Sequence, residues 1–77
     1  MDESTLRETL EDAVMPLLDG SPFGPLLAGR IRREVMGVLQ KHGLRGQVEV
    51  RDGGRLVRVD LKVGARVRAV VLTFSPH

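Results

Sequence analysis

The stretch that decides the fold is QVEVRDGGRLVRVDLKV, residues 47–63. In its first part Val48 and Val50 alternate with polar residues, a period of two that is typical of a strand with one buried face. Asp52-Gly53-Gly54 then supplies residues suited to the positive φ angles of a tight hairpin. The return segment alternates again, and its apolar face consists of Val57, Val59, Leu61 and Val63. We therefore expect strands over about residues 47–51 and 55–63.

A third segment, residues 66–74, follows Gly64 and completes the expected sheet. Its alternation is broken, because Val70, Val71 and Leu72 are consecutive apolar residues. A bulge, or a strand covered on both faces, would produce this pattern. We expect a strand over about residues 66–74 with one of these two features.

The first of two amphipathic segments precedes the sheet at about residues 5–18. Thr5 and Glu8 have the spacing of a capping box, which opens a helix. Pro16 should end or kink this helix, because proline lacks the N–H that a helix interior needs. Its apolar stripe consists of Leu6, Leu10, Val14, Leu17 and Leu18.

A second helix is expected over about residues 25–42, after a connector rich in proline and glycine. Pro25 suits the first helical turn, and we interpret Phe23 in the connector as a plug into the core. Gly43 stands where helices commonly stop in a left-handed residue, with Leu44 as the apolar contact of that cap. The apolar stripe consists of Leu27, Ile31, Val35, Val38 and Leu39.

The predicted fold class is α+β, with two helices on one face of a small antiparallel sheet. The order of elements is helix, helix, strand, strand, strand, and we expect one domain over residues 1–77. A chain of this length buries only about 60% of its unfolded surface, so a stabilising partner is expected. Both sheet edges lack a covering element, and such edges invite added strands.

The composition excludes several classes of function. The chain has no cysteine, so disulfides and thiolate metal sites are excluded and a reducing compartment is expected. No apolar run approaches about 18 residues, and the N-terminus lacks the apolar core of a signal peptide, so we expect no membrane association. Only two residues are aromatic, both Phe, so the core must consist of Leu and Val.

Catalytic groups are scarce in this sequence. His42 is expected at a helix end, where its role would be to interact with the helix dipole, and His77 is the last residue. Neither has a neighbouring pattern of metal ligands. Ser21 and Ser75 do not lie in the sharp strand-to-helix turn of a nucleophile. We expect no enzymatic activity, no cofactor, no metal and no small-molecule substrate.

The charges are segregated along the chain. Residues 1–29 hold one arginine and six acids, a net charge of −5, whereas the remaining residues hold eleven Lys and Arg and four acids, a net charge of +7. Internal salt bridges, a basic face for nucleic acid, or head-to-tail contacts between identical copies would each account for this split. We favour internal salt bridges.

A small basic nucleic-acid-binding module is the alternative function, since Lys and Arg supply affinity for phosphate. Single-strand binders usually stack bases on aromatic residues, and the predicted strands hold none before Phe74. Nucleic acid is therefore not the expected partner, and a regulatory adaptor for another protein is a third possibility. The residues that would serve a nucleic-acid interface are Arg30, Arg32, Arg33, Arg58, Arg66 and Arg68.

Four segments in order carry a resemblance: LDGSPFGPLL (18–27) with RIRR (30–33), VLQKHGLRG (38–46), GRLVRVDLKV (54–63) and RAVVLTF (68–74). They resemble the entry to the last helix, the end of that helix, the second strand and the closing strand in the C-terminal domain of bacteriophage contractile tail sheath proteins. The resemblance extends from about residue 6 to residue 74. Sheath-initiator proteins are similar in their helix-plus-hairpin core, and the resemblance implies an end piece of the sheath, such as an initiator, a collar or a terminator component.

The resemblance implies a structural subunit of a phage contractile tail or a related injection apparatus, which joins neighbours by β-strand addition. It would lie in the virion tail and in the host cytoplasm during assembly, and its partners would be copies of itself, tail sheath proteins or baseplate proteins. The last strand would fold back or be exchanged with a neighbour. The expected partner-binding edge is Arg66, Val67, Arg68, Ala69, Val70, Val71, Leu72, Thr73 and Phe74. The expected charged contacts are Arg30, Arg32, Arg33 and Arg58.

Overall fold

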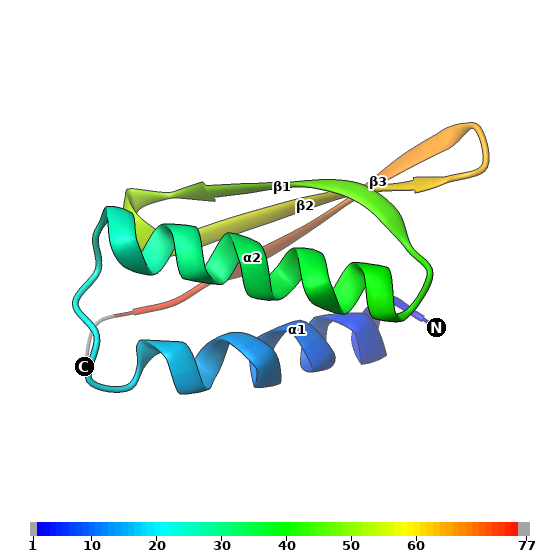
Figure 1. Ribbon diagram of the computed structural model, residues 1–77. Helices are drawn as coiled ribbons and strands as arrows, with labels where there is room; N and C mark the ends of the chain where they lie inside the picture. Colours follow the sequence, from blue (N-terminus) through cyan, green and yellow to red (C-terminus); the bar gives the residue numbers. More distant parts are fainter. Residues whose placement is uncertain (1, 76–77) are drawn as a thin grey trace.

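Two helices lie beneath a three-stranded antiparallel sheet in the computed structural model, which describes residues 2–75 (Figure 1). The elements are α1 (Glu3–Leu18), α2 (Pro25–Lys41), β1 (Arg45–Arg51), the 3-10 turn η1 (Asp52–Gly54), β2 (Leu56–Val63) and β3 (Arg66–Thr73). The strands follow one another in the sheet as in the chain. Helix α1 packs beneath β3 and α2 beneath β1. The predicted α+β fold of two helices and three strands is confirmed.

Helix α1 begins earlier than the sequence pattern indicated. Asp2 is the N-cap, and its Oδ1 accepts a hydrogen bond of 2.8 Å from the Thr5 N–H. The predicted capping box at Thr5 is therefore wrong, because a second good capping residue precedes it and claims its N–H. The helix also continues through Pro16 and ends two residues later, at Leu18.

Helix α2 begins and ends as predicted. Pro25 opens it, where the missing N–H has no helical acceptor to satisfy. At its end Gly43 adopts a left-handed conformation with φ of 67°. The Gly43 N–H donates to Gln40 O at 3.0 Å and the Leu44 N–H to Leu39 O at 2.8 Å, which is a Schellman cap. This cap turns the chain directly into β1.

The register of the sheet is unbroken along β2 and β3, from Leu56 opposite Thr73 to Val63 opposite Arg66. The prediction of a bulge, or of cover on both faces, for the third strand is therefore wrong. Its apolar run divides between the two faces: Val70 and Leu72 are buried against the helices, whereas Val71 points to the open face and is 40% exposed. The third strand is therefore regular, and Val71 is an apolar side chain on its solvent-facing side.

The core lies between the sheet and the helices and contains only Leu, Ile and Val. It consists of Leu6, Leu10, Val14, Leu27, Ile31, Val35, Leu39, Val48, Val57, Val59, Leu61, Val70 and Leu72. Phe23 packs against this cluster but stays half-buried, with the Arg55 guanidinium 5.1 Å from its ring centroid. Val63 was expected on the buried face, yet it is 56% exposed because the β2–β3 hairpin extends beyond the helices (Figure 1).

The loop between β1 and β2 has the positive φ angles that its sequence predicted, at 54° for Asp52, 68° for Gly53 and 118° for Gly54. It also holds the connector between the helices. The Gly24 N–H donates to Gly53 O at 2.9 Å. The start of α2 is therefore fixed to the end of the first hairpin.

Candidate assembly interface

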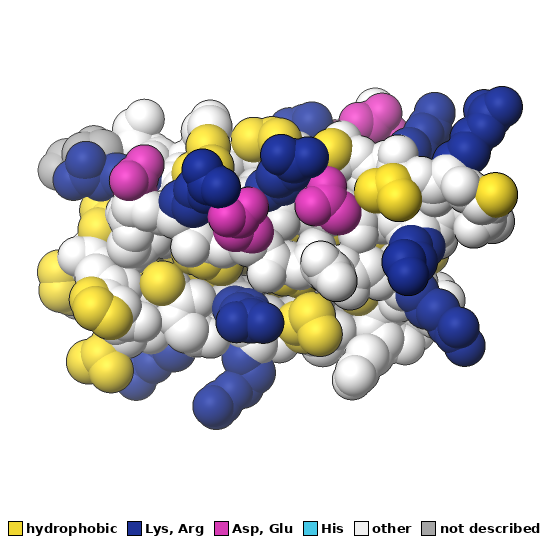
Figure 2. All heavy atoms as spheres, turned by 90° about the horizontal axis from the view of Figure 1, so that it is seen from above, with side chains coloured by type: hydrophobic (Ala, Val, Ile, Leu, Met, Phe, Trp, Pro, Cys, Tyr) yellow, Lys and Arg dark blue, Asp and Glu magenta, His cyan; other side chains and the backbone are white. Residues whose placement is uncertain are grey.

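The sheet has an open face, opposite the helices, on which twelve side chains stand. They are Arg45, Gln47, Glu49 and Arg51 on β1, Leu56, Arg58, Asp60 and Lys62 on β2, and Val67, Ala69, Val71 and Thr73 on β3. Figure 2 shows Lys and Arg side chains spread over this face, with a few acidic side chains among them. The face is thus charged over β1 and β2 and largely apolar along β3.

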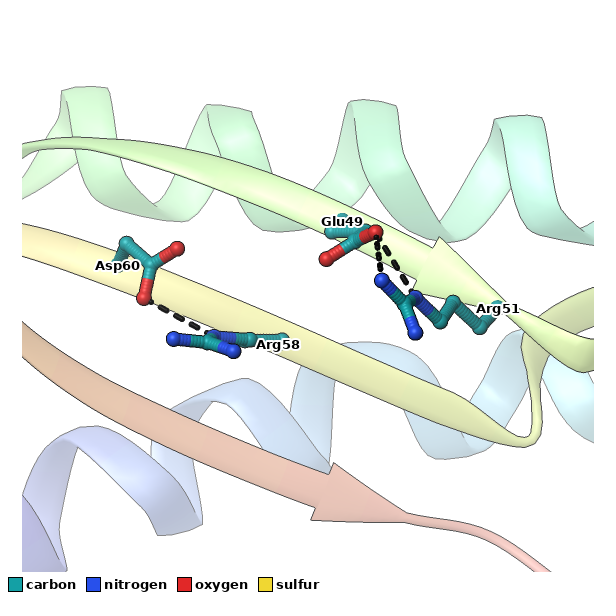
Figure 3. A network of polar contacts seen from close by, with 4 residues as sticks. All are labelled: Glu49, Arg51, Arg58 and Asp60. Atoms are coloured by element: carbon teal, nitrogen blue, oxygen red, sulfur yellow. Dashed lines mark hydrogen bonds and ion pairs between the residues drawn. The ribbon is translucent and has the colours of Figure 1, made fainter.

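Two ion pairs lie on this face, and each joins two residues of the same strand (Figure 3). Arg51 Nη2 lies 2.7 Å from Glu49 Oε1, and Arg58 Nε lies 3.1 Å from Asp60 Oδ1. These side chains are a third to two-thirds exposed, so each pair contributes little stability. They nevertheless occupy both carboxylates of the face.

Arg45 and Lys62 remain directly opposite each other on the same face, and like charges in that position repel. Among residues 2–75 no ion pair joins α1 to the basic remainder of the chain. The interpretation of the charge split as internal salt bridges is therefore wrong. The excess charges of both signs face solvent.

Strand β3 forms one edge of the sheet, and it folds back on β2 within this chain. The Phe74 N–H donates to Arg55 O at 2.7 Å, so Phe74 and every second residue before it turn their backbone groups toward β2. The residues between them turn their backbone groups outward. Four of the nine residues predicted for this edge therefore have outward backbone groups: Val67, Ala69, Val71 and Thr73.

One of these outward groups already has a partner. Arg7 Nη1, from α1, donates to the carbonyl oxygen of Val71 at 2.6 Å. Charged side chains that reach an edge strand hinder its pairing with another chain. Sequence reasoning missed Arg7, although it is the one cation among six acids in residues 1–29.

Strand β1 forms the other edge. Because β2 directs alternate residues to its two neighbours, the backbone groups of Gly46, Val48 and Val50 point away from the sheet. Among residues 2–75, no side chain or backbone group outside the sheet forms a hydrogen bond with these three. The β1 edge is thus more available to an added strand than the β3 edge.

The four predicted charged contacts do not come together. Arg30, Arg32 and Arg33 are exposed on α2, in the helical layer, whereas Arg58 stands on the open face of the sheet and is paired with Asp60. Arg30 borders a groove of about 410 Å³ together with Pro22 and other connector residues. No single basic patch forms from this set.

The side chains that could serve catalysis or metal binding do not come together. Ser21 and Ser75 both border a groove of about 930 Å³ at the end of α1, and no histidine is among its lining residues in the part of the chain that the structure describes. Residues 2–75 hold no group of three His, Asp or Glu side chains placed to bind a metal. His42 is exposed after α2, and His77 lies outside the described residues. The backbone hydrogen bond from Thr5 lowers the pKa of the exposed Asp2 carboxyl.

Within residues 2–75, neither helix has the length and hydropathy needed to cross a bilayer. Comparison with protein-family models, with curated proteins and with solved structures finds no match to this chain. The geometry of the sheet edges and the distribution of charge are therefore the observations on which a function can be argued.

Proposed function

We propose that this protein is a non-enzymatic structural subunit that joins its neighbours by β-strand addition at an edge of its sheet. The observation that carries the proposal is the three-stranded sheet, whose two edges have no further strand paired to them within residues 2–75. Main-chain hydrogen bonds along such an edge give affinity, and alternating side chains of the added strand give specificity.

The resemblance to the C-terminal domain of contractile tail sheath proteins supports a place in a phage tail or a related injection apparatus. The subunit would be a sheath initiator, collar or terminator component in the virion tail, made in the host cytoplasm. Its partners would be copies of itself, tail sheath proteins or baseplate proteins. Strand β3, or its exchange with a neighbour, would provide the junction.

Val71→Pro tests the edge directly. The Val71 N–H points away from β2, so proline removes an edge donor while it leaves the hydrogen bonds between β2 and β3 in place. We expect the variant to keep its circular dichroism spectrum and to lose assembly, measured by light scattering after size-exclusion chromatography, alone and with candidate tail proteins. Val71→Ala is the matched control, since it keeps the N–H. Assembly of Val71→Pro at the wild-type level would contradict the proposal.

A nucleic-acid-binding module remains the second candidate, and it is favoured by Arg45 and Lys62, which lie opposite each other and form no ion pair within residues 2–75. Two adjacent cations attract a phosphate. This function predicts a mobility shift of DNA or RNA that weakens steeply with salt, and that Arg45→Glu reduces. A protein that shifts neither nucleic acid at low salt lacks this activity.

A further inference from the structure

The two helices carry opposite charge and lie under opposite edges of the sheet. Helix α1 packs beneath β3, and α2 packs beneath β1 (Figure 1). The exposed acids of α1 include Glu8, Glu11 and Asp12, whereas its one arginine is bonded to Val71 O. The exposed side chains of α2 include four cations and one acid. Each sheet edge is therefore accompanied by a helix of one sign.

The flank of α1 beside the β3 edge can be assigned from Arg7. Its contact with Val71 O places that side of the helix at the edge. Residues four and eight positions further along a helix lie on the same flank, and these are Glu11 and Met15. Both are exposed. An acid and an apolar side chain thus border the β3 edge.

The flank of α2 beside the β1 edge follows from Arg30. Arg30 and connector residues such as Pro22 line one groove, and because the connector leads from α1, we assign the flank of Arg30 to the α1 side of the helix. Arg32 lies two positions on, about 200° around the helix, and Met36 follows it by one turn. Both are exposed and lie on the opposite flank. A cation and an apolar side chain thus border the β1 edge.

Glu11 and Arg32 carry opposite charges, and they also lie at the same level along the two helices. Leu18 and Pro25 stand on either side of the connector, where α1 ends and α2 begins. Glu11 precedes Leu18 by as many residues as Arg32 follows Pro25, and both helices rise about 1.5 Å per residue. The carboxylate and the guanidinium therefore stand at about the same level on the two sides of the molecule.

We propose that the neighbour in the assembly is a second copy of this chain, docked head to tail, with the β3 edge and Glu11 of one copy against the β1 edge and Arg32 of the next. This rests on the proposed function, in which a sheet edge joins subunits. The contact is heterologous, because the two surfaces differ, so it repeats from copy to copy and produces species larger than a dimer.

The strand edges fit this arrangement. Strands β1 and β3 are both antiparallel to β2 and hence parallel to each other, so a translated copy presents β1 parallel to β3. Val71 lies level with Glu49 across the sheet, between Val48 and Val50. In a parallel pair one residue bonds to the two that flank its counterpart. Those two residues of β1 have outward backbone groups, as Val71 does.

Arg7 blocks strand pairing at this junction. It occupies Val71 O, which is the acceptor that the Val50 N–H of the next copy requires. The guanidinium must leave before the strands can pair, so Arg7 opposes association at the β3 edge while the β1 edge stays open. Removal of this side chain's charged head is therefore expected to promote assembly.

A charge exchange tests the orientation. Glu11→Lys and Arg32→Glu should each weaken self-association at low salt by about fivefold or more, because each places like charges in contact. An equimolar mixture of the two variants should associate as the wild type does, and so should the double variant alone. Arg30→Glu is the matched control, with the same charge change on the opposite flank of α2. Light scattering over a concentration series gives the measurement, and urea unfolding checks that each variant folds.

Arg7→Met tests the blocking role of Arg7, and Val71→Pro separates strand addition from the head-to-tail orientation. Arg7→Met keeps an apolar stem and should strengthen self-association several-fold. If Val71→Pro abolishes self-association but the charge variants leave it unchanged, strand addition stands and the head-to-tail orientation is refuted. If the wild type stays monomeric and joins only another protein in a Val71-dependent way, the second copy is refuted as the neighbour. If the charge variants act and Val71→Pro does not, strand addition at this edge is refuted.

Discussion

Gly53→Ala probes the contact that holds the connector between the helices to the first hairpin. Gly53 has φ of 68°, and a Cβ at this position would lie 2.6 Å from the backbone nitrogen of Gly24. Gly53 O also accepts the Gly24 N–H at 2.9 Å, so the two backbones cannot separate without loss of that bond. The substitution therefore adds a steric clash to an unfavourable backbone conformation.

Gly64→Ala is the matched control for the size of each effect. Gly64 has φ of 62°, yet nothing lies within 4 Å of its Cβ position. A left-handed alanine costs about 1 kcal/mol, which is the whole loss expected for Gly64→Ala. Displacement of the Gly24 backbone adds about 2 kcal/mol, so Gly53→Ala should lose about 3 kcal/mol in total.

Urea unfolding followed by far-ultraviolet circular dichroism measures both free energies of unfolding. A domain of this length has a stability on the order of 5 kcal/mol, so a loss of about 3 kcal/mol shifts the midpoint by more than half. Equal losses for the two variants would refute the reasoning. In that case the approach of Gly53 to Gly24 would impose no constraint on the connector.

Three further predictions concern the helices. Leu10→Ala, at a residue with no exposed surface, should cost about 3 kcal/mol in urea unfolding, whereas Leu26→Ala, at a residue that is 87% exposed, should change stability by less than about 0.5 kcal/mol. The folded-state pKa of Asp2 is lowered, so its carboxylate stabilises the fold above the unfolded-state pKa and this contribution is lost as pH falls through the folded-state value; acid should therefore destabilise the wild type more than Asp2→Ala. Pro16→Ala restores an N–H that can donate to Asp12 O, and it should raise the free energy of unfolding by about 1 kcal/mol and increase the helical circular dichroism signal.

Much of the fold could be predicted because its elements have strong local patterns. The alternation along residues 57–61 leaves one register that buries the valines, and the cap at Gly43 is determined by adjacent residues. The start of α1 was misplaced because Asp2 and Thr5 are both good capping residues and their competition is settled by a single hydrogen bond. The expected irregularity of β3 failed because Val71 is an apolar residue on an exposed face, and the sequence does not show which face an edge residue occupies.

The candidate interface could be predicted only in outline. The order of the strands placed β3 at an edge, but the bond between Arg7 and Val71 joins residues 64 positions apart and depends on how α1 packs. The segregation of charge was visible in the sequence, but the sequence did not show which charged residues form ion pairs with one another. Arginines of the sheet pair with acids two positions away, as Arg51 does with Glu49, and leave the acids of α1 to solvent.

The packing of α1 beneath β3 has a consequence for folding, because it brings together the first and the last elements of the chain. The strands pair with their nearest neighbours in sequence, which favours rapid formation of the sheet. The apolar stripe of α1 packs on α2 as well, but it stays only partly covered until β3 arrives. A growing chain therefore cannot complete this core until β3 has left the ribosome, and the domain should fold in one cooperative step only after that point.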